Sequence, residues 1–155
     1  MQPAVRCNFC HLFPSALQIR PVFGWQAACF IGTVPSKADL LQDRAERFAV
    51  RVLKFISTLP QTPEGDSLRR QLARSAPGIS GNYRSARRGR SKAEFTSKLG
   101  VVVDEADETE RWLLMVKNAG LASGSELDSL IGESGELRAI YVASYGTARR
   151  NKGRT

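Results

Sequence analysis

Apolar residues recur along four segments of this chain at alternating intervals of four and three positions, with mostly polar residues between them. That spacing is the period of one face of an α-helix. In the first two segments the repeating positions are Leu41, Ala45, Phe48, Val52, Phe55 and Leu59, and then Leu68, Leu72, Ser75, Ile79, Asn82 and Ala86. In the last two they are Phe95, Leu99, Val102, Ala106, Thr109, Leu113 and Val116, and then Leu127, Leu130, Ser134, Leu137, Tyr141, Ser144 and Ala148. The pattern predicts four amphipathic helices.

Threonine and proline residues mark the boundary between the first two predicted helices. The first helix ends in the sequence LPQTP. Thr62 is suited to cap the second helix and Pro63 to occupy its first position, because an N–H group there has no helical partner. Pro77 lies inside the second helix. Since proline lacks an N–H group and its ring clashes with the carbonyl group of Ala73, a kink or a break is predicted there.

The other boundaries carry capping signals of their own. Ser91 and Glu94 have the spacing of a capping box for the third helix, and Ser123 and Glu126 have the same spacing before the fourth. Gly120 follows the third apolar stripe and is suited to end that helix in the left-handed conformation. The connections between helices are therefore predicted to be short.

Four amphipathic helices with short connections and no strand pattern predict an all-α protein, an up-and-down antiparallel four-helix bundle over residues 39–150. The mean spacing of 3.5 residues suits nearly parallel, coiled-coil-like packing. Val103, Trp112 and Met115 widen the apolar face of the third helix beyond one stripe. That width predicts a second buried surface, and so self-association. Residues 151–155 form a basic C-terminal tail.

The first 38 residues lack a helical period and hold the three cysteines, the single histidine and four of the seven prolines. Cys7, Cys10 and His11 have the spacing of a haem c attachment site, and with Cys29 they could in principle hold zinc. Haem attachment requires export, and no export signal is evident. We therefore interpret residues 1–38 as an extension, either disordered or foreign to the bundle, and expect no cofactor or metal.

Nothing in the sequence suggests a membrane protein. The apolar stretch VFGWQAACFIG is too short, and too interrupted, to span a bilayer. The sequence thus predicts a cytoplasmic protein with reduced thiols.

The positive charge is confined to one segment. The chain carries a net charge of +8. Residues 69–98 hold nine lysines and arginines but a single carboxylate, Glu94, so this segment alone accounts for the whole net charge. A local excess of this kind favours an anionic partner.

Arginines of the second predicted helix share one face. One stripe at helical spacing is offset by about 200° from the apolar stripe and consists of Arg70, Arg74, Pro77, Gly81, Arg84 and Arg88. The helix dipole explains one or two cations near the C-terminus, but not a series that reaches back to Arg70. A polyanion-binding surface, a solvated face and a dock for an acidic protein remain open as interpretations. The candidate nucleic-acid-binding residues are Arg70, Arg74, Arg84, Arg87, Arg88, Arg90 and Lys92.

The residues around this face limit the chemistry to expect. Tyr83 is the one aromatic residue next to the arginines, so contacts should be to phosphates, with little reading of sequence. Asp104, Glu105, Asp107, Glu108 and Glu110 form a carboxylate cluster, but the bundle has no histidine to complete a di-iron site. We interpret the cluster as a solvated face with internal pairs such as Asp107 with Arg111. It could alternatively meet the basic face of a neighbouring copy. No enzymatic activity is predicted.

Three stretches resemble one known family: DLLQDRAERFAVRVLKFISTLPQTP, LRRQLARSAPGISGNYRSARRGRSKAEFTSKLGVVVDEADETERWLLMV and ELRAIYVASYGTARR. The family is the bacterial four-helix bundle family, also called the 23S ribosomal-RNA intervening-sequence proteins. The resemblance covers residues 39–151 and is most specific at 74–82, 91–95 and 105–109. Pro77 departs from the family pattern.

The resemblance implies a ring-shaped homopentamer. It also relates the chain to the accessory protein of diversity-generating retroelements, a basic pentamer that binds nucleic acid and a reverse transcriptase. Two functions follow as expectations: a nucleic-acid-binding accessory protein that contacts RNA or DNA, or an oligomeric scaffold that docks an acidic partner such as a reverse transcriptase.

Overall fold

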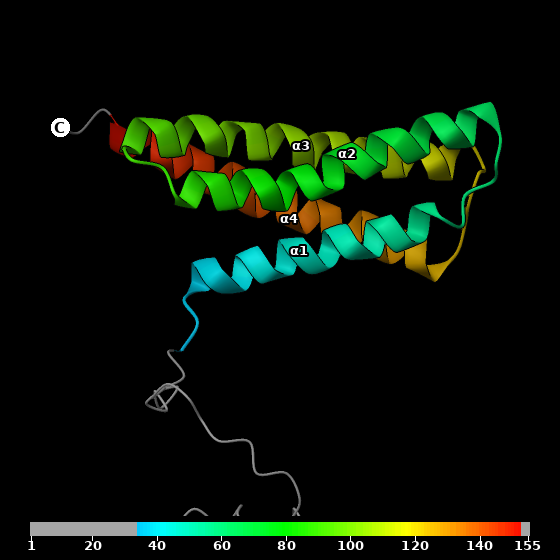
Figure 1. The fold of residues 1–155 in the computed structure, drawn as a ribbon, viewed down its shortest axis with the longest axis horizontal. Coiled ribbons are helices and arrows are strands. Elements are labelled where there is room, and N and C mark those ends of the chain that lie inside the picture. Colours follow the sequence, from blue (N-terminus) through cyan, green and yellow to red (C-terminus); the bar gives the residue numbers. More distant parts are fainter. Residues whose placement is uncertain (1–33, 153–155) are drawn as a thin grey trace, which may run out of the picture. The chain divides into compact units, whose positions relative to one another are not determined.

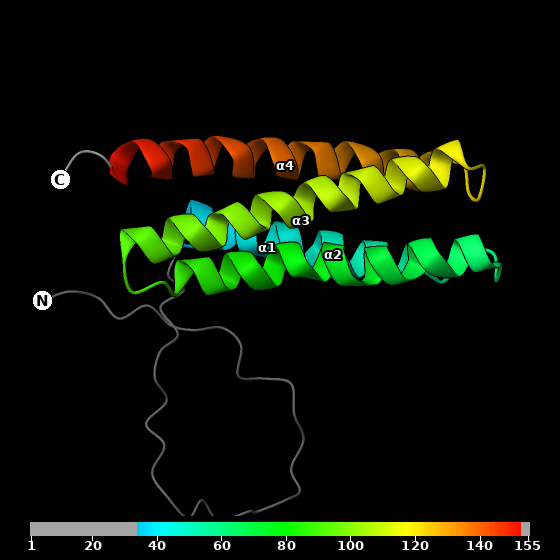
Figure 2. The same ribbon diagram turned by 90° about the horizontal axis from the view of Figure 1, so that it is seen from above.

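The computed structural model of the protein describes residues 34–152, which form four long helices and no strand. The helices are α1 (Lys37–Ile56), α2 (Pro63–Arg87), α3 (Lys92–Asn118) and α4 (Ser125–Lys152). They run alternately in opposite directions along one common axis (Figures 1 and 2). The predicted antiparallel four-helix bundle is thereby confirmed. The three cysteines and His11 lie outside the described residues, and so does the structure of the proposed extension up to residue 33.

The predicted apolar stripes form the core. Twenty of their positions are buried, and the other six are half-buried: Leu41, Leu68, Asn82, Phe95, Ser144 and Ala148. Two polar core positions, Thr109 of α3 and Ser75 of α2, are joined by a hydrogen bond of 2.9 Å between their hydroxyl groups. Small side chains facing each other in this way let α2 and α3 approach closely. The buried hydroxyl group of Tyr141 has no hydrogen-bond partner in the described structure. The end of the core where α1 begins holds two aromatic rings, Tyr83 and Tyr141, with centroids 5.2 Å apart.

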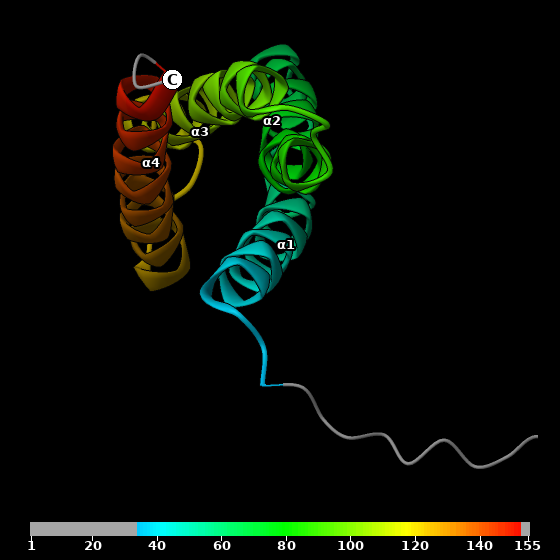
Figure 3. The same cartoon turned by 90° about the vertical axis from the view of Figure 1, so that its left-hand side faces the viewer.

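Consecutive helices pack closely, whereas α1 and α4 touch one another less than the other neighbouring pairs do. The view along the bundle shows this open arrangement (Figure 3). The α1–α4 seam is polar. Arg44 of α1 donates to Glu133 of α4 at 2.6 Å, and Arg51 of α1 pairs with Glu126 of α4 at 3.1 Å. Ion pairs of partly exposed groups contribute little stability, so the fold depends mainly on the other three seams.

The helix ends follow the predicted signals in part. Ser36 caps α1, and Asp39 completes a capping box with it, so the helix starts two residues before the predicted boundary at residue 39. Thr62 caps α2 through the N–H group of Gly65, with Pro63 as the first helical residue, as predicted.

The ends of α3 and α4 differ more from expectation. Gly120 has a φ of 66° and ends α3 in the left-handed conformation, as predicted. At the start of α3, Ser91 caps the N–H group of Glu94, but the Glu94 carboxylate accepts from Arg90 at 2.8 Å and not from Ser91. The predicted capping box is thus only half formed.

The capping box predicted before α4 is wrong. This helix begins at Ser125, directly after Gly124, whose φ of 114° favours glycine. Within residues 34–152 no hydrogen bond joins Ser123 to Glu126, because Glu126 instead accepts from Arg51 of α1.

Pro77 does not break α2, which continues from Pro63 to Arg87 without interruption. Because Pro77 has no N–H group, the carbonyl group of Ala73 lacks its helical donor. Ala73 is exposed, so water is available to that carbonyl. Gly78 follows directly and leaves room for the Glu105 side chain of α3, whose carboxyl group would lie 2.7 Å from a Cβ atom added there. Of the predicted kink or break at Pro77, the break is therefore wrong, and the kink stays a prediction.

Candidate nucleic-acid interface

The seven predicted binding residues are all exposed. Four of them, Arg70, Arg74, Arg84 and Arg88, follow the face of α2 that is turned away from the core. Arg90 and Lys92 continue this surface through the short turn into α3. We call the six residues other than Arg87 the basic face: Arg70, Arg74, Arg84, Arg88, Arg90 and Lys92. Within the described part of the chain, none of these six forms an ion pair.

Arg87 differs from the others because its guanidinium group pairs with Asp39 at the start of α1. Hydrogen bonds from the Ser36 side chain and from Arg87 lower the pKa of Asp39 to about 2. The carboxylate also raises the pKa of Arg87. Arg87 therefore joins α1 to α2, and we remove it from the set of residues available to a ligand.

Two nearby cations that lie outside the predicted set have structural contacts. Arg69 donates to the backbone carbonyl groups of Ile56 at 3.1 Å and Leu59 at 2.8 Å, which holds the end of α1. Lys98 pairs with Glu94 at 3.0 Å. The excess charge of residues 69–98 thus divides into cations that stabilise the fold and the basic face.

Arg74 marks the border between the basic face and the carboxylates of α3. Burial raises the pKa of Glu105, Glu108 raises it further, and the positive charge of Arg74 opposes the shift. One carboxyl oxygen of Glu105 is buried without a hydrogen-bond partner in the described structure. The cluster also contains the predicted pair of Asp107 with Arg111, at 3.2 Å.

The structure changes the interpretation of the aromatic residues. Tyr83 is only 7% exposed and its ring packs against Tyr141, so it is not available to stack on a ligand. Phe95, assigned to the core by its spacing, is half-buried instead and lies in the first turns of α3, next to Arg90 and Lys92 in the chain.

The end of α4 adds cations that the prediction did not include. Because the helices alternate in direction, α4 ends at the same end of the bundle where α2 ends and α3 begins (Figure 1). We call this the basic end. Arg149 and Arg150 are exposed there, with Arg149 5.7 Å from the centre of the Tyr145 ring. The sequence signal was the pair Arg149 and Arg150 at the end of the predicted bundle, whose position beside the basic face depends on the topology.

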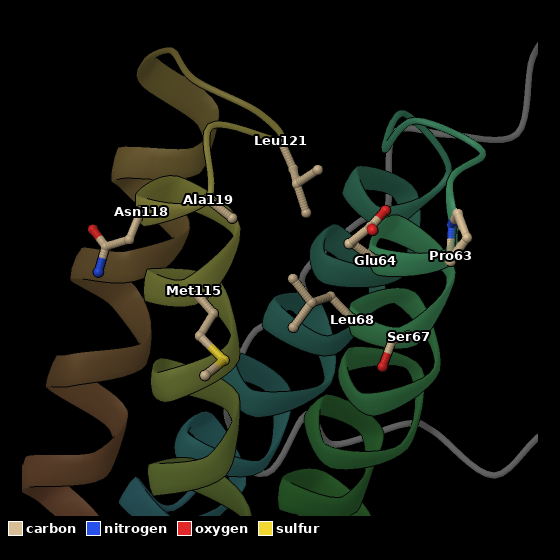
Figure 4. A pocket seen from close by; sticks show the side chains of 8 residues that line it. All are labelled: Pro63, Glu64, Ser67, Leu68, Met115, Asn118, Ala119 and Leu121. Atoms are coloured by element: carbon tan, nitrogen blue, oxygen red, sulfur yellow. The ribbon is translucent and has the colours of Figure 1, made fainter.

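A pocket lies at the opposite end of the bundle, between the start of α2 and the end of α3 (Figure 4). It has a volume of about 680 Å³, and its lining includes Leu68, Met115 and Leu121. The one charged residue in this lining is Glu64, which suits no anionic ligand. The pocket is therefore separate from the basic face.

Between residues 34 and 152, no group of three or more His, Cys, Asp or Glu side chains is placed to hold a metal ion. No helix in that range is long and apolar enough to cross a bilayer.

A four-helix bundle with one strongly basic helix face is the class of protein that these observations define. The model of the 23S rRNA-intervening sequence protein family matches residues 40–143, and the chain belongs to that family. No curated protein matches the chain.

A crystal structure of a protein of unknown function from the S23 ribosomal protein family of Bacteroides thetaiotaomicron has the same fold. The two chains share 24% identity with a TM-score of 0.61, over 72% of this chain and 99% of the other.

Proposed function

We propose that the protein is a non-enzymatic, oligomeric nucleic-acid-binding protein that contacts the phosphates of RNA or DNA through the basic face. The observation that carries the proposal is that six exposed cations lie along α2 and the turn into α3 without an ion pair in the described structure. Residues 69–98 hold nine lysines and arginines but one carboxylate, and a local excess of positive charge attracts a polyanion.

The alternative of a merely solvated face is less consistent with the same contacts. Arg69, Arg87 and Lys98 each have a carboxylate partner, so this segment contains acceptors where the fold uses a cation. The helix dipole favours cations in the last turn of α2, but Arg70 lies in its first half. A phosphate backbone would meet both ends of the row.

The first test is a titration of labelled RNA and duplex DNA with the full-length protein over a salt series, with heparin as a non-nucleic polyanion. We expect both nucleic acids to bind, and log Kobs to fall linearly with log salt, because each neutralised phosphate releases counterions. Absence of binding to RNA and DNA at low salt would contradict the proposal. Docking of an acidic protein such as a reverse transcriptase would then take its place.

We also propose that the protein assembles as a homopentamer, as the family resemblance implies. The apolar residues that support self-association are partly different from those predicted. Val103 and Trp112 pack against the core of their own bundle, whereas Met115 is 47% exposed, and Leu114 and Val101 are exposed on the same helix. Several symmetric copies would present several basic faces, so modest affinity at each would combine into avidity.

Light scattering tests this assembly directly. We expect the mass of a pentamer at micromolar concentration, because the exposed apolar residues of α3 gain burial only between copies. Replacing Met115 and Leu114 with serine should reduce the mass, while the same change at Leu40, exposed at the start of α1, serves as the comparison. A stable monomer for the unmodified protein would contradict the proposal.

A further inference from the structure

A groove opens at the basic end, between the first turns of α3 and the last turns of α4. It is lined by Phe95, Ala143, Ser144, Thr147 and Ala148, and has a volume of about 470 Å³. That volume falls within the range of about 300–1,000 Å³ typical of ligand sites. Its lining consists of one aromatic ring, two alanines and two hydroxyl groups. We call it the Phe95 groove.

Cations stand on both sides of this groove. On the α3 side, Lys92 precedes Phe95 by three positions and so lies on the same helix face, with Arg90 in the turn before it. On the α4 side, Arg150 donates to the hydroxyl group of Thr147 at 3.2 Å, which brings its guanidinium group to the rim. An apolar groove between two groups of cations suits a ligand that has an apolar part for the groove and anionic groups on either side for the cations.

Carboxylates do not line this groove. The nearest one in the sequence, Glu94, accepts hydrogen bonds from the backbone N–H group of Arg90 and pairs with Lys98. Those contacts lower its pKa, with the backbone hydrogen bond as the largest cause. Glu94 is therefore already engaged, and the charge around the groove stays positive.

We propose that the Phe95 groove receives an unpaired base of single-stranded nucleic acid, while Arg90, Lys92 and Arg150 hold the phosphates on either side. This inference rests on the proposed function and adds a preference to it. Every base has a π face that stacks on an aromatic ring, so an open aromatic groove binds single strands with little regard to sequence. A duplex keeps its bases paired, so it would contact the cations but not the groove.

Two variants test the groove without removing charge. Ala143→Leu fills it from an exposed position of α4, and Phe95→Leu keeps an apolar side chain but removes the ring. Ala139→Leu is the matched control, because Ala139 is exposed one turn earlier on the same helix and outside the groove. The measurement is the affinity for a short single-stranded RNA and for a duplex of the same sequence, at one salt concentration and along a salt series.

We expect the unmodified protein to bind the single strand more tightly than the duplex. Ala143→Leu and Phe95→Leu should weaken single-strand binding by about 5- to 150-fold, the loss that corresponds to one stacked base. Their salt slopes and their duplex affinities should stay the same, and Ala139→Leu should change neither affinity.

Three outcomes would overturn the inference: unchanged single-strand affinity in Ala143→Leu, an equal loss on single strand and duplex, or a change of oligomeric state that assigns the groove to an interface between copies. The failure of the broader proposal is distinguishable from these. If the unmodified protein binds neither nucleic acid at low salt, the proposed function itself fails. If it binds both equally and Ala143→Leu has no effect, only the groove is excluded.

Discussion

A variant with glutamine at Arg70, Arg84, Arg88 and Arg90 is expected to bind RNA and duplex DNA more weakly by on the order of 10²–10³-fold near 0.1 M salt. These four residues are exposed and have no ion pair within residues 34–152, so each is free to neutralise a phosphate. Each lost contact should reduce the slope of log Kobs against log salt by about 0.7–0.9. Binding titrations over a salt series measure both quantities.

Folding should survive these four changes, since exposed substitutions usually alter stability by less than about 0.5 kcal/mol each. The control variant carries glutamine at four exposed residues of α1 and α3 outside the basic face: Arg47, Lys54, Arg111 and Lys117. Arg111 and Lys117 pair with Asp107 and Asp128, so this control also removes two surface ion pairs. The two variants have the same net charge, so a difference between their affinities reports where the removed cations lie and not how many were removed. Equal weakening in both variants would show that net charge, and not the basic face, determines binding.

The second large effect is expected on stability, at Gly65 in the first turn of α2. This glycine is buried, and a Cβ atom added to it would overlap the backbone carbonyl oxygen of Pro60. A backbone atom cannot rotate away as a flexible side chain can. We therefore expect Gly65→Ala to lower the free energy of unfolding by about 1–3 kcal/mol, the usual cost of overpacking. Chemical denaturation measures the change.

Gly132 in α4 provides the comparison, because it is exposed and a Cβ atom added there would meet nothing within 4 Å. Gly132→Ala should raise stability by about 0.5–1 kcal/mol, since alanine loses less backbone entropy in a helix. If Gly65→Ala were as stable as the parent, the approach of Pro60 to Gly65 would not be a constraint on the fold.

The four helices were predictable because their signal is local. A stripe such as Leu99, Val102 and Ala106 shows which face is buried without reference to any other helix, and the structure buries all three completely. Pro77 and Ser123 show where local reasoning fails. The exposure of Ala73 makes the proline tolerable, and the contact between Arg51 and Glu126 replaces the predicted cap. Both depend on how the helix sits in the bundle.

The basic face was predictable for the same reason, because a face opposite an apolar stripe is exposed. The pairing of Arg87 was not, since its partner Asp39 lies 48 residues earlier in the chain. The Phe95 groove was likewise hidden. Phe95 belongs to a core stripe by spacing, and only the direction of α4 brings Thr147 and Arg150 to the same end of the bundle.

The sparse α1–α4 seam has a consequence for the order of assembly of the chain. The three well-packed seams join consecutive helices, so each can form by closing a short turn, and topologies dominated by such local contacts are typical of rapid folding. The α1–α4 seam instead joins the first and last helices, and closing that long loop has the largest entropic cost. The seam between the helices most distant in the sequence is therefore also the seam that contributes least to the packing of the fold.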